Sequence, residues 1–142
     1  MEKTSLYAYI KLTGNDDFPI ATVTEQLNVQ PTETWKVGDA IRPNHPHKWA
    51  YTCWKYETKQ IETLDSEDVL RPLLNTFQSK VEIINNLKTE LHLDVQLELV
   101  IIMEEGRTPG LVIYPEFSTF AAAINAFLDI DMYINPFTEQ NE

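Results

Sequence analysis

LDVQLELVIIM, residues 93–103, is the stretch that decides the fold of this chain. Its apolar residues fall at every second position, and Asp94, Gln96 and Glu98 stand between them. This period of two predicts a β-strand with one face in a core and the other toward water. From Val100 to Met103 the alternation is lost and all four residues are apolar, so we expect both faces of the strand to be covered there.

A second strand is predicted to follow directly. EEGRTPG, residues 104–110, is rich in turn-forming residues, and LVIY, residues 111–114, can return alongside the first strand. The two strands together predict a central antiparallel hairpin.

Two periodicities, alternation for strands and spacings of three and four for helices, predict the elements in the rest of the chain. Alternation predicts further strands over residues 6–12, 49–57 and 130–134. Spacings of three and four predict helices over residues 20–27, 70–91 (with a bend at 78–80) and 117–128. The order β-α-β-α(α)-β-β-α-β predicts an α+β fold with a mainly antiparallel sheet of about five strands and helices packed on one face. We expect one domain over residues 1–137 and a frayed tail over 138–142.

Length and composition predict an ordinary globular domain. The chain has 142 residues, of which 43% are hydrophobic and 23% charged. No apolar run is long enough to cross a bilayer, and the N-terminus lacks the pattern of a signal peptide, so we expect a cytoplasmic protein. Cys53 is the only cysteine, which excludes a disulfide framework and a four-cysteine zinc site.

The net charge of −11 is the most informative bulk property. Phosphate backbones and anionic lipid surfaces would be repelled, so the sequence predicts neither a nucleic-acid nor a membrane partner. A basic protein partner would be attracted. Acidity also keeps many small proteins soluble without any partner, and the sequence leaves both interpretations open.

Residues suited to catalysis or metal binding are sparse. His45 and His47 could hold a transition metal with Cys53 or Asp39, but exposed loop histidines are the commoner outcome. The chain has no glycine-rich phosphate loop and no nucleophile elbow around a serine. The sequence therefore predicts no catalytic residue, no metal and no cofactor, and it disfavours an enzyme.

Aromatic residues cluster beside a long irregular connection, residues 29–48, that contains three prolines and Trp35. We expect Trp35 to pin this connection as an ordered loop. Aromatic anchors with a polar rim are typical of protein-binding surfaces, although some of these rings could simply fill the core. Alternation places Trp49 and Trp54 on opposite faces of their predicted strand, so at least one should face away from the helices.

Several short motifs, in the same order and over nearly the whole chain, resemble the family named Domain of Unknown Function 4279. They are TGNDDF at 13–18, LNVQPT at 27–32, WKxGD at 35–39, WKYET at 54–58, PEF at 115–117 and LDID at 128–131. The resemblance implies a small bacterial or phage-borne protein and brings no established activity or catalytic residues. It adds weight to Thr32, Trp35, Gly38 and Asp39. One physical account is that Asp39 and Thr32 bond the loop backbone, Gly38 supplies a positive φ and Trp35 anchors the loop.

Two functional hypotheses follow from the sequence. The first is a non-enzymatic protein that neutralises a basic protein partner, such as an immunity protein or an inhibitor. The second is a small-molecule or enzymatic site between the turn at 14–18 and the loop at 35–39. A structural subunit that dimerises through a strand edge is a third alternative, since the sequence does not give the oligomeric state. The predicted binding residues are Asp16, Thr32, Trp35, Gly38, Asp39, Trp49, Trp54 and Tyr56.

Overall fold

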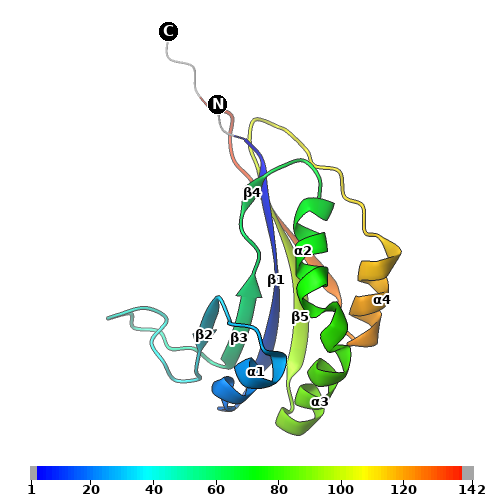
Figure 1. The fold of residues 1–142 in the computed structure, drawn as a ribbon. Helices are drawn as coiled ribbons and strands as arrows, with labels where there is room; N and C mark the ends of the chain where they lie inside the picture. Colours follow the sequence, from blue (N-terminus) through cyan, green and yellow to red (C-terminus); the bar gives the residue numbers. More distant parts are fainter. Residues whose placement is uncertain (1–2, 139–142) are drawn as a thin grey trace.

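The computed structural model describes residues 3–138 and shows one sheet with helices on one side (Figure 1). Within these residues six strands pair in the order β2-β3-β1-β5-β6, and β4 pairs with β1 beside this path. Their bounds are β1 Ser5–Gly14, β2 Glu33–Trp35, β3 Thr52–Glu57, β4 Ile61–Glu62, β5 Asp94–Met103 and β6 Leu128–Ile134. The predicted α+β class and single mainly antiparallel sheet are confirmed, with one strand more than expected.

The β1–β5 ladder is the longest pairing in the sheet. It runs antiparallel from Ser5 opposite Ile102 to Thr13 opposite Asp94. On its other side β1 pairs antiparallel with β3, and β5 pairs with β6 in parallel. In this register the apolar residues of β1 lie opposite the apolar residues of β5, so the core residues of both strands point to the same face of the sheet.

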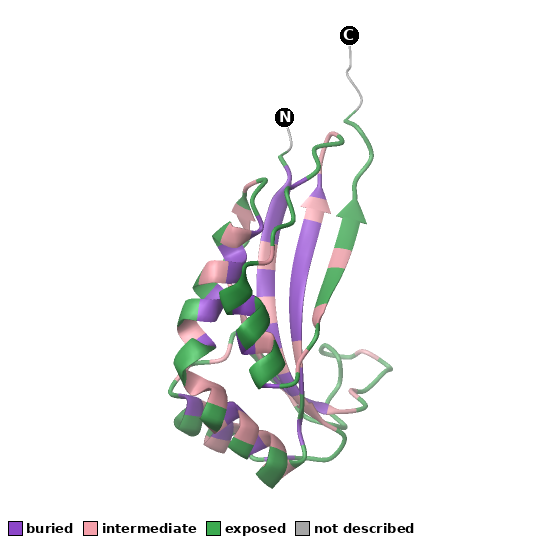
Figure 2. Cartoon of the chain, turned by 90° about the vertical axis from the view of Figure 1, so that its right-hand side faces the viewer, coloured by how far each residue is buried: buried purple, intermediate pink, exposed green. Residues whose placement is uncertain are grey.

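The helices cover that face of the sheet and leave the opposite face open (Figures 1 and 2). They are α1 Ile20–Leu27, α2 Glu67–Phe77, the 3₁₀ turn η1 Gln78–Lys80, α3 Val81–Leu91 and α4 Pro115–Ala123. Even-numbered residues of β1 and odd-numbered residues of β5 pack against the apolar sides of these helices. The predicted bend at residues 78–80 is confirmed as the turn that joins α2 to α3. Asn28 ends α1 in the left-handed conformation, with φ 53°.

The predicted central hairpin is wrong in its second half. Residues 111–114 form no strand, and the place beside β5 is taken by β6. Ser66 explains the course of this segment, because its hydroxyl accepts from the N–H of Val112 at 3.1 Å and so holds the chain near the start of α2. From there the chain enters α4 and crosses back to β6, which makes β5-α4-β6 a parallel crossover.

Other differences concern the ends of elements. The strand predicted from residue 49 begins at Thr52, and the helix predicted to reach residue 128 ends at Ala123. The three-residue β2 and two-residue β4 were not predicted, since runs this short carry no periodicity. The predicted tail, residues 138–142, lies outside the described residues except for Thr138, whose N–H donates to Glu105 Oε1. Among the described residues, no helix combines the length and apolar character that a bilayer crossing requires.

Replacing Leu99 with Ala is expected to lower the free energy of unfolding by about 2–5 kcal/mol. Leu99 lies in the middle of β5 with 0% of its surface exposed, so the truncation leaves a cavity in the core. Urea unfolding measures the change. Leu64→Ala, at a side chain that is 50% exposed, serves as the control, and an equal loss in both variants would contradict the position of the core.

Candidate functional site

The sheet face opposite the helices, called the open face here, carries many polar and aromatic side chains. Paired residues lie on the same face, so the registers of β1 with β3 and β5, and of β2 and β6 with their neighbours, identify its members. They include Tyr7, Tyr9, Lys11 and Thr13 of β1; Glu33 and Trp35 of β2; Cys53, Lys55 and Glu57 of β3; Asp94, Gln96 and Glu98 of β5; and Asp129, Asp131 and Tyr133 of β6.

An aromatic cluster of Trp35, Trp49 and Tyr51 stands at the β2 side of the open face. The rings of Trp35 and Trp49 stack with centroids 4.0 Å apart and an interplanar angle of 14°. Tyr51 meets both edge-on, at 5.7 Å from Trp35 and 5.9 Å from Trp49. Both tryptophans keep part of their surface exposed. The indole N–H of Trp35 is buried and has no hydrogen-bond partner among the described residues.

The loop between β2 and β3 rises from this cluster and projects away from the helices (Figures 1 and 2). Backbone bonds close its base, from Gly38 N–H to the Trp49 carbonyl at 2.9 Å and from Trp49 N–H to the Asp39 carbonyl at 2.8 Å. Trp35 and Trp49 lie on the two backbone segments that form this base, and their rings stack on one another. The predicted anchoring of the loop by Trp35 is therefore confirmed. The loop is cationic at neutral pH, unlike the chain as a whole, since it carries Lys36, Arg42 and Lys48 against Asp39.

Three other predicted binding residues hold the backbone of this region. Asp39 Oδ2 accepts from the N–H of Lys36 at 3.2 Å, and Thr32 Oγ1 accepts from the N–H of Glu57 at 2.8 Å. Gly38 has φ +89°, a conformation that favours glycine. The architectural account is therefore confirmed for Asp39 and Gly38, whereas Thr32 bonds the backbone of Glu57 in β3 and not that of the loop.

Trp54 and Tyr56 lie on the helix side of the sheet, not on the open face. Trp54 is wholly buried, donates from its indole N–H to Thr24 Oγ1 at 3.0 Å and meets Phe77 edge-on. Tyr56 is half-buried and also packs on Phe77. Placing Trp54 among surface binding residues is corrected, because strand alternation turns it into the core. Trp49 and Trp54 lie on opposite faces of the sheet, as predicted, although Trp49 precedes β3.

The turn at residues 14–18 approaches the loop at 35–39, as the second hypothesis requires. Lys36 Nζ lies 3.9 Å from Asp17 Oδ1, and both side chains are more than half exposed. Asp16 is exposed. A shallow hollow of about 390 Å³ lies beside the turn, and its lining includes Gly14, Lys11 and Tyr51. Asp16, Asp39 and Trp35 do not line it, so these residues do not converge as that hypothesis expected.

A polar chain of side chains crosses the middle of the open face. Lys55 Nζ lies 2.8 Å from Glu57 Oε1 and 4.3 Å from the centre of the Tyr9 ring. The hydroxyl of Tyr9 donates to Glu98 Oε2, and Gln96 Nε2 donates to the same oxygen at 3.2 Å. These contacts join β3, β1 and β5. Sequence alternation predicts a water-facing Glu98, yet only 3% of its surface is exposed, and the side chains of Tyr9, Gln96 and Asp131 contact it.

Glu98 lies beside two carboxylates of β6, Asp129 and Asp131. The pKa of Glu98 is raised to about 6, first by burial and then by the hydrogen bond with Asp131 and the charges of Asp131 and Asp129, while the bond from Tyr9 lowers it. Carboxylate oxygens of the three residues lie within 4.8 Å of one another, a spacing at which oxygen ligands can hold a divalent cation. The sequence did not predict this group, because the parallel register of β5 and β6 is not visible in it.

Cys53 and the two loop histidines do not join such a group within the described residues. Cys53 is fully buried, and burial raises its pKa to about 12, although Lys11 and Lys55 oppose this. His45 Nδ1 accepts from the N–H of His47 at 3.0 Å, and the two rings are 5.4 Å apart. One histidine therefore positions the backbone of the other at the exposed tip of the loop.

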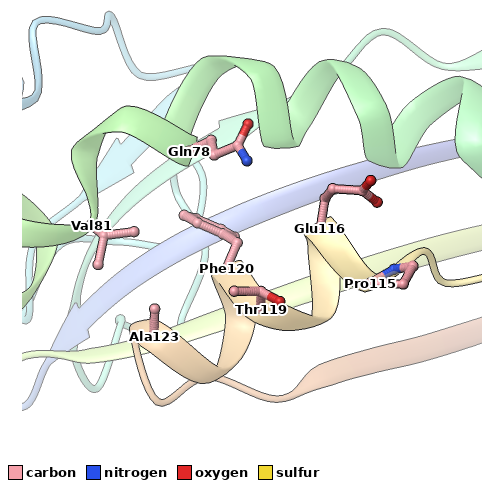
Figure 3. A pocket seen from close by; sticks show the side chains of 7 residues that line it. All are labelled: Gln78, Val81, Pro115, Glu116, Thr119, Phe120 and Ala123. Atoms are coloured by element: carbon pink, nitrogen blue, oxygen red, sulfur yellow. The ribbon is translucent and has the colours of Figure 1, made fainter.

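The helix side of the domain also carries a groove. It has a volume of about 350 Å³ and lies between α4 and the junction of α2 with α3 (Figure 3). Its lining is Gln78, Val81, Pro115, Glu116, Thr119, Phe120 and Ala123. Glu116 is its one ionisable residue and lies 3.8 Å from Arg71 Nη2, so the groove lacks the pair of titratable groups that acid–base chemistry uses.

Comparison with known proteins agrees with the motifs in the sequence. The model of the family described as Domain of unknown function (DUF4279) matches residues 3–135. The chain belongs to the DUF4279 family. No curated protein and no solved structure matches it. The loop and the open face both lie within this DUF4279 domain.

Replacing Gly38 with Ala is expected to lower the free energy of unfolding by about 1 kcal/mol. No atom lies within 4 Å of the added methyl group, so the cost comes from the positive φ alone. Gly110→Ala is the matched control, because Gly110 has no positive φ and its methyl group would meet only the Leu64 carbonyl oxygen at 3.8 Å. Urea unfolding of both variants measures the difference, and equal stabilities would contradict a strained loop base.

Replacing Glu98 with Gln is expected to make the domain relatively more stable as pH rises. The pKa of Glu98 is about 6 in the folded chain against an ordinary value of 4.5, so the folded state holds the extra proton between these values. The stabilisation of the folded state by this carboxyl is complete below pH 4.5 and is lost as the pH rises through 6. Gln does not titrate, so the stability difference between variant and parent should rise by about 1–2 kcal/mol across this window.

Chemical unfolding at a series of pH values measures that difference. Glu90→Gln, at an exposed position of α3, removes the same charge away from the open face. A difference for Glu98→Gln that stays constant with pH would show that this carboxyl is not held in the protonated form.

Proposed function

We propose that this protein is a non-enzymatic binding protein that neutralises a basic protein partner through its open face. The observation that carries the proposal is the combination on one face of an aromatic cluster and a group of carboxylates. Trp35, Trp49 and Tyr51 stand over β2, and Glu98, Asp129 and Asp131 lie on β5 and β6. Three strand steps separate β2 from β5, about 14 Å at the usual strand spacing, so one partner surface of standard size covers both.

The aromatic cluster supplies the apolar part of such an interface. Large rings held in place by stacking contribute binding area at little cost in side-chain entropy, and tryptophan and tyrosine are enriched among the residues that dominate binding energy. Trp35 and Trp49 are fixed by the closed base of the loop before any partner arrives. This preorganisation lowers the entropy lost on association.

The carboxylates supply attraction and orientation. A net charge of −11 accelerates encounter with a basic protein and discourages encounter with acidic ones. The loop is cationic whereas β5 and β6 carry carboxylates, so the two ends of the open face differ in charge. The partner would place its basic patch over β5 and β6 and apolar or acidic groups near the loop. Immunity proteins and inhibitors that cover a basic enzyme or toxin are the class of binding protein that this pattern favours.

A small-molecule site in the hollow beside the turn is the second candidate. The observation that favours it is the meeting of the turn and the loop through Lys36 and Asp17. Lys11 and Tyr51 would make the contacts, since both line the hollow and Lys11 Nζ lies 6.0 Å from the centre of the Tyr51 ring. A ligand there would be anionic and aromatic, and its binding would not depend on Asp129 or Asp131.

Affinity capture from host-cell lysate with immobilised protein tests the first proposal. Trp49→Ala and the double variant Asp129→Asn with Asp131→Asn should each lose at least tenfold of a captured protein with pI above about 9. With that protein purified, the association rate should fall more than tenfold between about 50 and 500 mM NaCl, because screening removes the electrostatic attraction.

Glu82→Gln with Glu90→Gln is the matched control, since it removes two charges from exposed positions of α3 on the helix side. This control should capture as much as the parent protein. Capture of the same basic protein by the parent and by both open-face variants would overturn the proposal, as would loss of capture in the control alone.

A further inference from the structure

The outer edge of β6 combines three properties that edge strands of monomeric proteins avoid. β6 is the last strand of the sheet and pairs only with β5 among the described residues. Its sequence LDIDMYI has no lysine or proline, and its two charged residues, Asp129 and Asp131, lie on the open face and leave the helix side apolar. The opposite edge strand, β2, has only three residues. A free edge of seven residues offers a template for pairing with another strand.

The helix-side face of β6 is also apolar and uncovered (Figure 2). Ile130, Met132 and Ile134 are 37%, 49% and 71% exposed, whereas their register partners on β5 are 0%, 0% and 8% exposed. Half of the exposed large hydrophobic side chains in the described chain fall within eleven residues of sequence. They are Phe127, Ile130, Met132, Tyr133, Ile134 and Phe137. Such a concentration on one edge marks an association surface rather than scattered exposure.

The backbone of β6 determines which residues can pair outward. The Phe127 carbonyl accepts from Leu97 N–H, and the Asn135 N–H donates to the Met103 carbonyl, so odd-numbered residues turn their backbone groups to β5. In a parallel ladder the alternate residues turn theirs away. The even-numbered residues 130, 132 and 134 therefore present N–H and C=O groups at the free edge, on the same residues whose apolar side chains are exposed.

The positions of the apolar side chains and of the carboxylates then distinguish the registers in which two copies of β6 could pair. In an antiparallel two-fold pairing centred on Met132, Ile130 lies opposite Ile134 of the second copy and Asp131 lies opposite Tyr133. Centring the pairing on Asp131 would instead oppose two like charges, which destabilises a cross-strand pair. The Met132-centred register thus buries the apolar side chains of both copies together and leaves the carboxylates beside a phenol.

We propose that the free edge of β6 pairs antiparallel with β6 of a second copy of this chain, in a two-fold dimer centred on Met132. The two sheets become continuous, and the open faces of both copies lie on the same side of the joined sheet, because opposite residues of an antiparallel pair point to the same face. The contact is isologous, as the two-fold axis requires. This inference rests on the edge of β6 and does not require the proposed function, although Asp129 and Asp131 of the same strand belong to the open face.

Sedimentation equilibrium from about 1 to 100 µM protein tests the dimer. The parent should show twice the chain mass of 16.4 kDa at the upper end. Association should persist or strengthen at about 500 mM NaCl, because both copies carry the same net charge and salt screens their repulsion. This is opposite to the salt response expected for the basic partner, so failure of one proposal is distinguishable from failure of the other.

Met132→Lys should yield the monomer mass, because it brings two ammonium groups together at the two-fold axis. Leu64→Lys is the matched control, since Leu64 is 50% exposed against 49% for Met132, and it should remain dimeric. Ile134→Lys, at a side chain that is 71% exposed, provides a second disruptive variant whose folding is checked by circular dichroism. A monomeric parent at every concentration, or a Leu64→Lys variant that dissociates like Met132→Lys, would overturn the proposal.

Cysteine pairs test the register. Asp131→Cys combined with Tyr133→Cys should give disulfide-linked dimers under mild oxidation, seen on non-reducing gels, because these positions face one another in the Met132-centred pairing. Asp131→Cys alone should not link, since it has no facing cysteine in that register. Rapid linking of the single variant, or none in the double variant, would overturn the register.

Discussion

The antiparallel ladder between β1 and β5 is the constraint on which the rest of the structure depends. Both strands are ten residues long, and their alternation coincides over the whole length of the pairing. A slip of one residue would turn every apolar side chain of one strand toward the open face, so burial fixes the register strongly. Once it is fixed, one face must be covered by helices and the other is available to polar and aromatic side chains. The position of every group on the open face follows from this pairing.

The sequence correctly predicts the strands and helices whose apolar periodicity matches the side that is buried in the structure. β1, β5 and the helices α1 to α4 are found where alternation or helical spacing places them, because each has a single apolar side. Residues 111–114 show the limit of this reasoning. LVIY has strand-forming composition, yet the segment is an exposed connection held by Ser66, and nothing local in the sequence reports that contact.

The same limit applies to the candidate site. The loop residues Gly38 and Asp39 could be understood from sequence because turn chemistry is local: the Asp39 carboxylate bonds a backbone N–H three residues away and glycine accepts a positive φ. Thr32 instead bonds Glu57, 25 residues away, through the pairing of β2 with β3. The carboxylate group on β5 and β6 could not be predicted from sequence, since its members are about thirty residues apart and meet through a parallel pairing. Trp54 was misplaced for a related reason, because the residue type alone does not distinguish a core ring from a surface anchor.

Cys53 has a consequence for the redox behaviour of the domain. Thiols react with oxidants as thiolates, and burial, which raises the pKa of Cys53 to about 12, disfavours the thiolate at neutral pH. The side chain is also wholly buried beneath the β2–β3 pairing, in which Trp35 lies opposite it. While the domain is folded, oxidants therefore reach and react with this thiol only slowly.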